Sequence, residues 1–284
     1  MGDKVKKYID SRFRTSGTPT DFQINLIDDI ECSQDQVVYV NAVSFPNTIY
    51  TVQTTNNKLY VLESEYNAGA DSYTNYARVL TIPEGNYSGL SLEAALTTAL
   101  AVNRPLSSTL TVAYVPTEGA IKITMSGNDR IWLPSSEELM DPTWRAANWD
   151  GATVPASHTA SYSTTTPNSI GDVMRISGPT TYVSVFKSGL LDLRVNHVLY
   201  LHSSLTSYQS LTSRGERTAI ARIPINADFG YVVHWANNAL SDDYMAVGSQ
   251  RFRTLRFRLT NAYGTTVDLH GGHISLKLIF AETK

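Results

Sequence analysis

Short runs in which apolar and polar residues alternate, separated by turn residues, recur from one end of the chain to the other. The clearest lies near the C-terminus, where leucine and phenylalanine alternate with arginine over residues 255–259. Successive side chains of a β-strand point to opposite faces, so this pattern predicts a strand with one buried and one solvated face. Strands of this kind with turns between them are typical of a β-sandwich or barrel, and the series predicts about ten strands.

One segment has helical instead of alternating spacing. Leu92, Leu96 and Leu100 fall on one side of a helix, together with alanines, and Ser91 provides a capping hydroxyl just before them. We therefore predict one short helix over residues 92–101. The strands expected over 110–115 and 120–125 should form a hairpin across the turn residues between them.

Charge and cysteine content exclude several classes of protein. The 284 residues include 23 basic and 26 acidic side chains, a net charge of −3, so neither sequence-specific nucleic-acid binding nor attraction to an anionic membrane is expected. Cys32 is the only cysteine, which leaves no internal disulfide framework. The sequence has no stretch of 18 consecutive apolar residues, so we predict no membrane insertion.

The alternating pattern disappears between about residues 126 and 177, where proline, serine, threonine and glycine are frequent. We interpret this region as a long insertion. Loops of this length in a compact domain are uncommon and usually functional, so the insertion is a candidate contact surface. Its tryptophans, Trp144 and Trp149, are the candidate outer-loop contacts. The alternative is an excursion of the chain that has no partner.

The sequence lacks the residue patterns of catalytic and metal sites. His270 and His273 flank a Gly-Gly pair, but a mononuclear zinc enzyme needs three converging ligands. We interpret the two histidines as the start of the last strand, where they can hydrogen-bond backbone groups left unpaired by the bend. There is no Gly-x-Ser-x-Gly elbow, no Walker loop and no Gly-x-Gly-x-x-Gly motif after a strand. We therefore predict a protein that is not an enzyme and uses no cofactor or metal.

Four segments, spread in order over the chain, carry a family resemblance. They are YIDSRFRTSGTPTDFQINL, LTIPEGNYSGLSLEAALTTAL, NHVLYLHSSL and LRFRLTNAYGTTVDLHGGHISLKLIF. Together they resemble the penton, or minor capsid, proteins of the Polinton, adintovirus and virophage group of double-stranded DNA viruses. The resemblance implies an all-β fold, a single jelly-roll β-sandwich of about eight core strands in two facing sheets.

The same resemblance implies a function and a set of partners. It predicts a structural capsid protein that forms a homopentameric penton at icosahedral vertices, beside a double-jelly-roll major capsid protein. The first expected partner is therefore another copy of this chain, and the second is the major capsid protein. The expected location is the virion, after synthesis in the cytoplasm or nucleus of the host cell.

The strand pattern and the resemblance together predict how the chain is divided. Residues 1–20, with several lysines and arginines, are expected to form an N-terminal arm, and residues 21–284 a jelly-roll domain that contains the insertion. Such an arm can tie each copy to its neighbour through pairs of arginine and carboxylate. Arg12, Arg14 and Asp21 are therefore the candidate subunit contacts.

Two other functions stay open. A receptor- or glycan-binding jelly-roll module, such as a spike or lectin-like domain, would use Trp144 and Trp149 as stacking platforms and would bind a host receptor or spike. The chain lacks the Arg-Gly-Asp tripeptide by which some adenoviral penton bases bind integrins. A β-rich hydrolase would need paired acids such as Asp28 and Asp29, but adjacent acids in a strand point to opposite faces.

Overall fold

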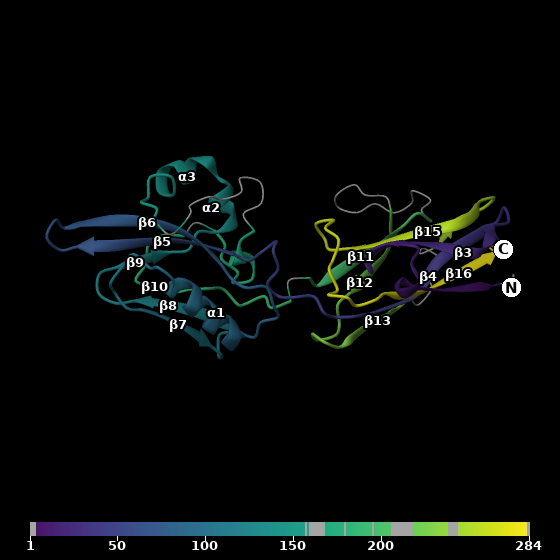
Figure 1. Cartoon of the computed structure of the whole chain (residues 1–284), viewed down its shortest axis with the longest axis horizontal. Coiled ribbons are helices and arrows are strands. Elements are labelled where there is room, and N and C mark those ends of the chain that lie inside the picture. The colour runs from purple at the N-terminus through teal and green to yellow at the C-terminus, as the bar shows by residue number, and fades with distance from the viewer. Residues whose placement is uncertain are drawn as a thin grey trace. The chain divides into compact units, whose positions relative to one another are not determined.

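The computed structural model describes residues 4–156, 158, 168–178, 180–194, 196–205, 218–237 and 244–282. Its strands and helices form two compact units (Figure 1). Unit 1 consists of Met1–Ile49 together with Asn196–Lys284, and unit 2 consists of Tyr50–Val195. The chain therefore leaves unit 1 once, forms unit 2 from one continuous segment and then returns.

Unit 1 is built from two antiparallel sheets. The strand order of the first is β1 (Val5–Asp10), β16 (Ser275–Glu282), β4 (Gln36–Pro46) and β13 (Val232–Ala236), and β14 (Met245–Ala246) also pairs with β4. The order of the second is β12 (Ala219–Pro224), β11 (Val198–Ser203), β15 (Arg251–Thr260), β3 (Asp21–Glu31) and β2 (Ser16–Gly17). Without the two-residue strands β2 and β14, each sheet has four strands.

This arrangement is that of a jelly roll, because the chain alternates between the two sheets. It runs from β1 in the first sheet to β3 in the second, back to β4 in the first and then to β11 in the second. One apolar core joins the sheets. Val38 and Phe280 of the first sheet and Leu201 and Phe257 of the second are all fully buried in it. The predicted all-β, single jelly-roll fold is therefore confirmed.

The N-terminal segment is a strand of this sandwich. All six residues of β1 pair with β16, and the side chain of Ile9 lies in the core. A short 3₁₀ helix, η1 (Ser11–Phe13), follows and is capped by Asp10. The expected division into an arm over 1–20 and a domain over 21–284 therefore differs from the structure, because the first strand forms the edge of its own chain's sheet.

Unit 2 contains two three-stranded sheets and the three α-helices of the described residues. One sheet has the order β6 (Ser72–Thr81), β5 (Lys58–Asn67), β9 (Arg130–Trp132), and the other β10 (Val185–Lys187), β8 (Ala120–Met125), β7 (Leu110–Val115). The helices are α1 (Gly89–Ala101), α2 (Ser136–Met140) and α3 (Pro142–Asn148), with a 3₁₀ turn, η2 (Ile170–Asp172). Leu92, Leu96 and Leu100 of α1 share a core with Val112 and Ile123 of the second sheet.

The predicted helix is present but begins earlier than expected. Ser88, not Ser91, is the N-cap, and its hydroxyl accepts from the backbone N–H of Ser91. The Ser91 hydroxyl in turn accepts from the N–H of Ser88. This reciprocal pair is a capping box, so both serines stabilise the helix start.

The insertion expected over 126–177 is part of a larger one. Unit 2 begins at Tyr50, because β5 to β8 pack around a core of their own instead of joining the jelly roll. The described part of 126–177 also contains α2 and α3, which differs from the prediction of a single helix. Helices of five and seven residues are too short to show a helical period in the sequence.

The α-helices of the described residues are all confined to unit 2. Among the residues that the structure describes, no helix is both long enough and apolar enough to cross a bilayer. The longest of them, α1, has 13 residues and packs against β7.

Candidate functional site

The outer face of the second sheet in unit 1 is rich in arginine. Arg256 and Arg258 alternate along β15 with buried Leu255 and Phe257, as the sequence pattern predicts. The Arg256 guanidinium pairs with the carboxylate of Asp21 on β3, with Nη2 lying 3.1 Å from Oδ1. This pair joins two neighbouring strands across the solvated face of the sheet.

A pocket of about 260 Å³ lies beside these arginines. Its lining residues are His202, Ser203, Ser204, Thr218, Arg256 and Arg258. The buried His202 ring has Nδ1 2.9 Å from Oγ1 of Thr218 and Nε2 3.0 Å from Oγ1 of Thr260. Guanidinium and hydroxyl groups can donate hydrogen bonds, and none of the described lining residues is acidic. Arg256 already pairs with Asp21, so the positive charge beside the pocket is partly neutralised within the chain.

Arg12 and Arg14 are two of the predicted subunit contacts. Both form hydrogen bonds that stabilise the segment after β1. Arg12 forms a two-point pair with Asp10, in which Nη2 lies 2.7 Å from Oδ2 and Nε lies 3.0 Å from Oδ1. This pair lowers the pKa of the Asp10 carboxyl, mainly through the side-chain hydrogen bond from Arg12. Arg14 donates to the carbonyl oxygens of Ser11 and Gly17.

The structure therefore places the three predicted contacts in two locations. Arg12 and Arg14 lie together beside η1, whereas Asp21 lies on the second sheet and pairs with Arg256. Each of the three has a partner within its own chain. Their contact with a second subunit stays a prediction.

Trp144 and Trp149 belong to an aromatic cluster in unit 2. Trp149 is only 1% exposed, and its ring centroid lies 5.7 Å from that of Tyr60. Trp144 packs edge-on against Trp132, with ring centroids 5.1 Å apart. The prediction that both tryptophans are outer-loop contacts is therefore corrected for Trp149, because α3 folds back onto the sheet and buries that ring. A stacking platform for a glycan needs an exposed ring face.

Large apolar side chains are exposed at both outer strands of the first sheet in unit 1. On β1 and the turn after it, Tyr8 and Phe13 are each 74% exposed. On the opposite side, Tyr231 just before β13 is 70% exposed, and its neighbour Val232 is also exposed. Sequence reasoning missed these residues, because an edge strand and a central strand have the same side-chain period.

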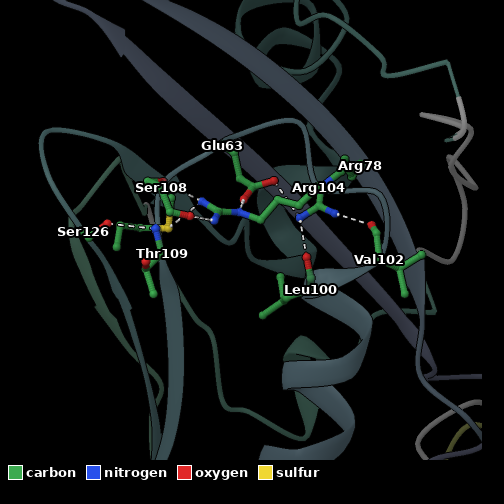
Figure 2. A network of polar contacts seen from close by, with 9 residues as sticks. Glu63, Arg78, Leu100, Val102, Arg104, Ser108, Thr109 and Ser126 are labelled. Atoms are coloured by element: carbon green, nitrogen blue, oxygen red, sulfur yellow. Dashed lines mark hydrogen bonds and ion pairs between the residues drawn. The ribbon is translucent and has the colours of Figure 1, made fainter.

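A buried cluster of charges lies in unit 2 (Figure 2). Glu63 on β5 pairs with Arg78 on β6, with 2.7 Å between Oε2 and Nη2, and with Arg104, whose Nε lies 2.6 Å from Oε1. Arg78 also donates to the carbonyl oxygens of Leu100 and Val102, each at 3.1 Å. These two carbonyls lie at the C-terminal end of α1, where a positive charge is favourable.

The second arginine of this cluster extends it toward β7. Arg104 donates to the carbonyl oxygen of Ser108, and its Nη2 lies 3.0 Å from the Ser108 hydroxyl oxygen. The cluster thus ties the β5–β6 hairpin, the end of α1 and the segment before β7 to one carboxylate. Burial lowers the pKa of the Arg78 guanidinium, and the nearby Glu63 carboxylate opposes this shift. The arrangement is structural in character, since it is closed off from solvent.

The two histidines of the Gly-Gly segment lie in the turn that leads into β16. His270 has Nδ1 2.9 Å from the backbone oxygen of Thr48. His273 has Nδ1 3.1 Å from the hydroxyl oxygen of Ser11, which also accepts from the backbone N–H of Ile274. Both side chains therefore tie this turn to distant parts of unit 1, and β16 begins two residues after His273.

Comparison with known proteins shows a likeness in structure but none in sequence. No protein-family model matches the sequence, and none of the curated proteins matches it either. Among solved structures, the fold is similar to that in the crystal structure of selenomethionine-labelled mavirus penton protein, with a TM-score of 0.52 over 99% of this chain and 100% of that chain. The two sequences are 11% identical. The likeness therefore concerns the fold, and it extends over both units.

Proposed function

We propose that this chain is a structural capsid protein of a virus and forms the homopentameric penton at icosahedral vertices. The observation that carries the proposal is the full-length similarity to the mavirus penton protein, which extends over unit 2 as well as the jelly roll. A jelly roll alone would be a weak basis, because one fold serves many functions. A whole second unit inserted between β4 and β11 makes the shared architecture more specific.

In this proposal the protein acts by packing against other capsid subunits. Five copies form a closed ring, and the ring contacts a double-jelly-roll major capsid protein around it. The protein would be made in the host cytoplasm or nucleus and would then reside in the virion. A host receptor or a spike is a further partner that a vertex protein can engage.

The proposal assigns no catalysis to the chain. Burial raises the pKa of the Cys32 thiol, so its reactive thiolate is disfavoured. His270 and His273 are engaged with distant groups of unit 1. Across the described residues, there is no group of three side chains suited to hold a metal ion.

The size and shape of the purified full-length chain test the proposal. Sedimentation velocity should give a species of about 157 kDa, five times the 31.3 kDa of one chain. Negative-stain electron microscopy should show rings with five-fold symmetry. A chain that stays monomeric at physiological ionic strength, and that does not sediment with particles of the major capsid protein, would contradict the proposal.

A further inference from the structure

We propose that β1 and β13, the two outer strands of one sheet in unit 1, carry the two halves of the contact between neighbouring copies of this chain. The inference rests on the pentamer proposed above and names the surfaces through which it forms. The occupant of each edge is a second copy of the same protein. The edges are defined as residues 4–13 for the β1 edge and 226–237 for the β13 edge.

A ring of five copies needs two different surfaces on every copy. A rotation that closes after more than two steps joins patch A of one subunit to patch B of the next, which is a heterologous contact. β1 and β13 lie at opposite ends of the strand order of the first sheet. In the described residues, β1 pairs only with β16 and β13 only with β4, so each strand has one unpaired side.

Both edges carry apolar surface that a monomer would leave in water. The β1 edge exposes Tyr8 and Phe13, and the β13 edge exposes Tyr231 and Val232. Aromatic side chains are enriched in the cores of protein interfaces. Large apolar side chains that are this exposed are candidates for contact with another protein. Each edge therefore has the composition of half an interface.

The charges of the two edges differ. The β1 edge contains Lys4, Lys6 and Lys7, and the acid among them, Asp10, is already paired with Arg12. Residues 226–237 contain one acid, Asp228, and no lysine or arginine. Like charges that face each other disfavour a contact, so this difference helps to set which surfaces meet.

The lysines of the β1 edge also act against the wrong contact. An open edge strand tends to pair with an identical strand of another copy, and lysines on the edge oppose this through like-charge repulsion. A β1–β1 contact would bring together two groups of three lysines. A β1–β13 contact instead brings the lysines toward an edge that has no lysine or arginine. The charge pattern thus favours the ring-forming contact over a two-fold dimer.

Substitutions on each edge test this assignment. The β1-edge variant combines Tyr8→Asp with Phe13→Asp, and the β13-edge variant combines Tyr231→Lys with Val232→Lys. All four side chains are exposed, so both variants should keep the circular dichroism spectrum of the unaltered chain. Each variant alone should lose the five-copy species and sediment as a monomer. The matched controls are Tyr263→Asp and Tyr263→Lys, since Tyr263 is 72% exposed on unit 1 but lies on neither edge, and both should stay pentameric.

Mixing the two variants gives the sharper result. The β1-edge variant keeps its β13 edge, and the β13-edge variant keeps its β1 edge. In a one-to-one mixture these two intact edges can form one contact, and assembly cannot continue beyond the dimer. Sedimentation at high protein concentration should show a heterodimer of about 63 kDa, twice the 31.3 kDa of one chain. Neither variant should form this species alone.

The outcomes separate the inference from the proposed function. If the unaltered chain is not pentameric, the pentamer on which this inference rests is contradicted, whatever the edge variants show. If the unaltered chain is pentameric and either edge variant stays pentameric, the edges are not the contact and this inference is overturned alone. Monomeric variants that give no heterodimer when mixed would overturn the pairing of β1 with β13. If a double variant misfolds, serine substitutions at the same positions replace it, with the same outcomes.

Discussion

Glu63 and Arg78 form an ion pair of 2.7 Å in which neither side chain is exposed to solvent. Removing two charges from water costs several kcal/mol of desolvation free energy, on the order of the values known for buried ions. The buried pair is therefore stable only when each charge keeps its partner. Among the described residues, Glu63 is the one carboxylate that pairs with both Arg78 and Arg104. Unit 2 therefore depends on one acidic side chain to neutralise buried positive charge at the end of α1.

The first prediction concerns that carboxylate. Glu63→Gln should lower the free energy of unfolding of unit 2 by about 3–5 kcal/mol, because it leaves Arg78 buried without a counter-charge. Guanidinium unfolding followed by tryptophan fluorescence measures this loss, since Trp132, Trp144 and Trp149 all lie in unit 2. Glu118→Gln is the control, because the Glu118–Lys187 pair is exposed and its loss should leave the midpoint unchanged. Equal midpoints for the two variants would contradict the structural role of the cluster.

The second prediction concerns the buried tryptophan of the aromatic cluster. Trp149→Ala should destabilise unit 2 by about 3–5 kcal/mol, because it leaves a large cavity against Tyr60 and Leu139. Urea unfolding followed by circular dichroism measures the loss. Trp144→Ala, at a half-buried ring of the same cluster, should cause a smaller one. A stable Trp149→Ala variant that has lost binding to a glycan array would instead favour the stacking-platform hypothesis.

The third prediction concerns alkaline stability. Burial raises the pKa of Tyr182 from its ordinary value of 10.0 to about 12. The unfolded chain therefore loses this phenol proton at lower pH than the folded chain, so the stabilisation is complete below pH 10 and is lost between pH 10 and 12. Tyr182→Phe removes the ionisable hydroxyl group and should therefore shift alkaline unfolding to higher pH. A pH titration of the near-ultraviolet circular dichroism of both proteins measures the shift, and identical curves would count against it.

The fourth prediction compares two glycines of unit 1 that share a left-handed backbone. Gly17 and Gly230 have φ of 89° and 85°, so alanine is strained at both positions. A Cβ at Gly17 would lie 2.2 Å from the backbone oxygen of Asp21, whereas one at Gly230 would meet nothing within 4 Å. Gly230→Ala should therefore lower the free energy of unfolding by about 1–2 kcal/mol, and Gly17→Ala by clearly more. Thermal melting of both variants measures the two losses of stability. Equal losses would show that the backbone around Gly17 moves to accommodate the added Cβ.

The fifth prediction concerns the independence of unit 2. Residues 50–195 have two apolar clusters of their own and form one continuous segment, so the isolated segment should fold. Its circular dichroism should show the helical signal of α1, and its unfolding should be cooperative. The same segment with Glu63→Gln should unfold at lower guanidinium concentration. A segment that lacks cooperative unfolding would mean that unit 1 is needed to stabilise it.

Much of the fold could be predicted from side-chain period. The hairpin expected over 110–115 and 120–125 is present with the same bounds as β7 and β8. Turn residues and alternation act locally, so a single sequence contains enough information for such an element. β1 was not predicted, because its lysines interrupt the alternation of apolar residues. Its place as a strand depends on β16, more than 260 residues later in the chain.

The candidate site was harder to predict for a related reason. Arg12, Arg14 and Asp21 have the right chemistry for ion pairs, but the sequence does not show that Asp10 and Arg256 are nearer partners than a second subunit. The burial of Trp149 depends on how α3 folds onto β5, which no local pattern reveals. The boundary of unit 2 was invisible, because its strands alternate in the same manner as those of the jelly roll.

The pairing of β1 with β16 also has a consequence for the order of events during translation. β1 is synthesised before unit 2, and its partner β16 is synthesised after unit 2. At about 5–20 residues per second, unit 2 is complete several seconds before β16 emerges. The jelly roll can close only after β16 has been synthesised, so β1 stays without its partner strand while unit 2 can already fold.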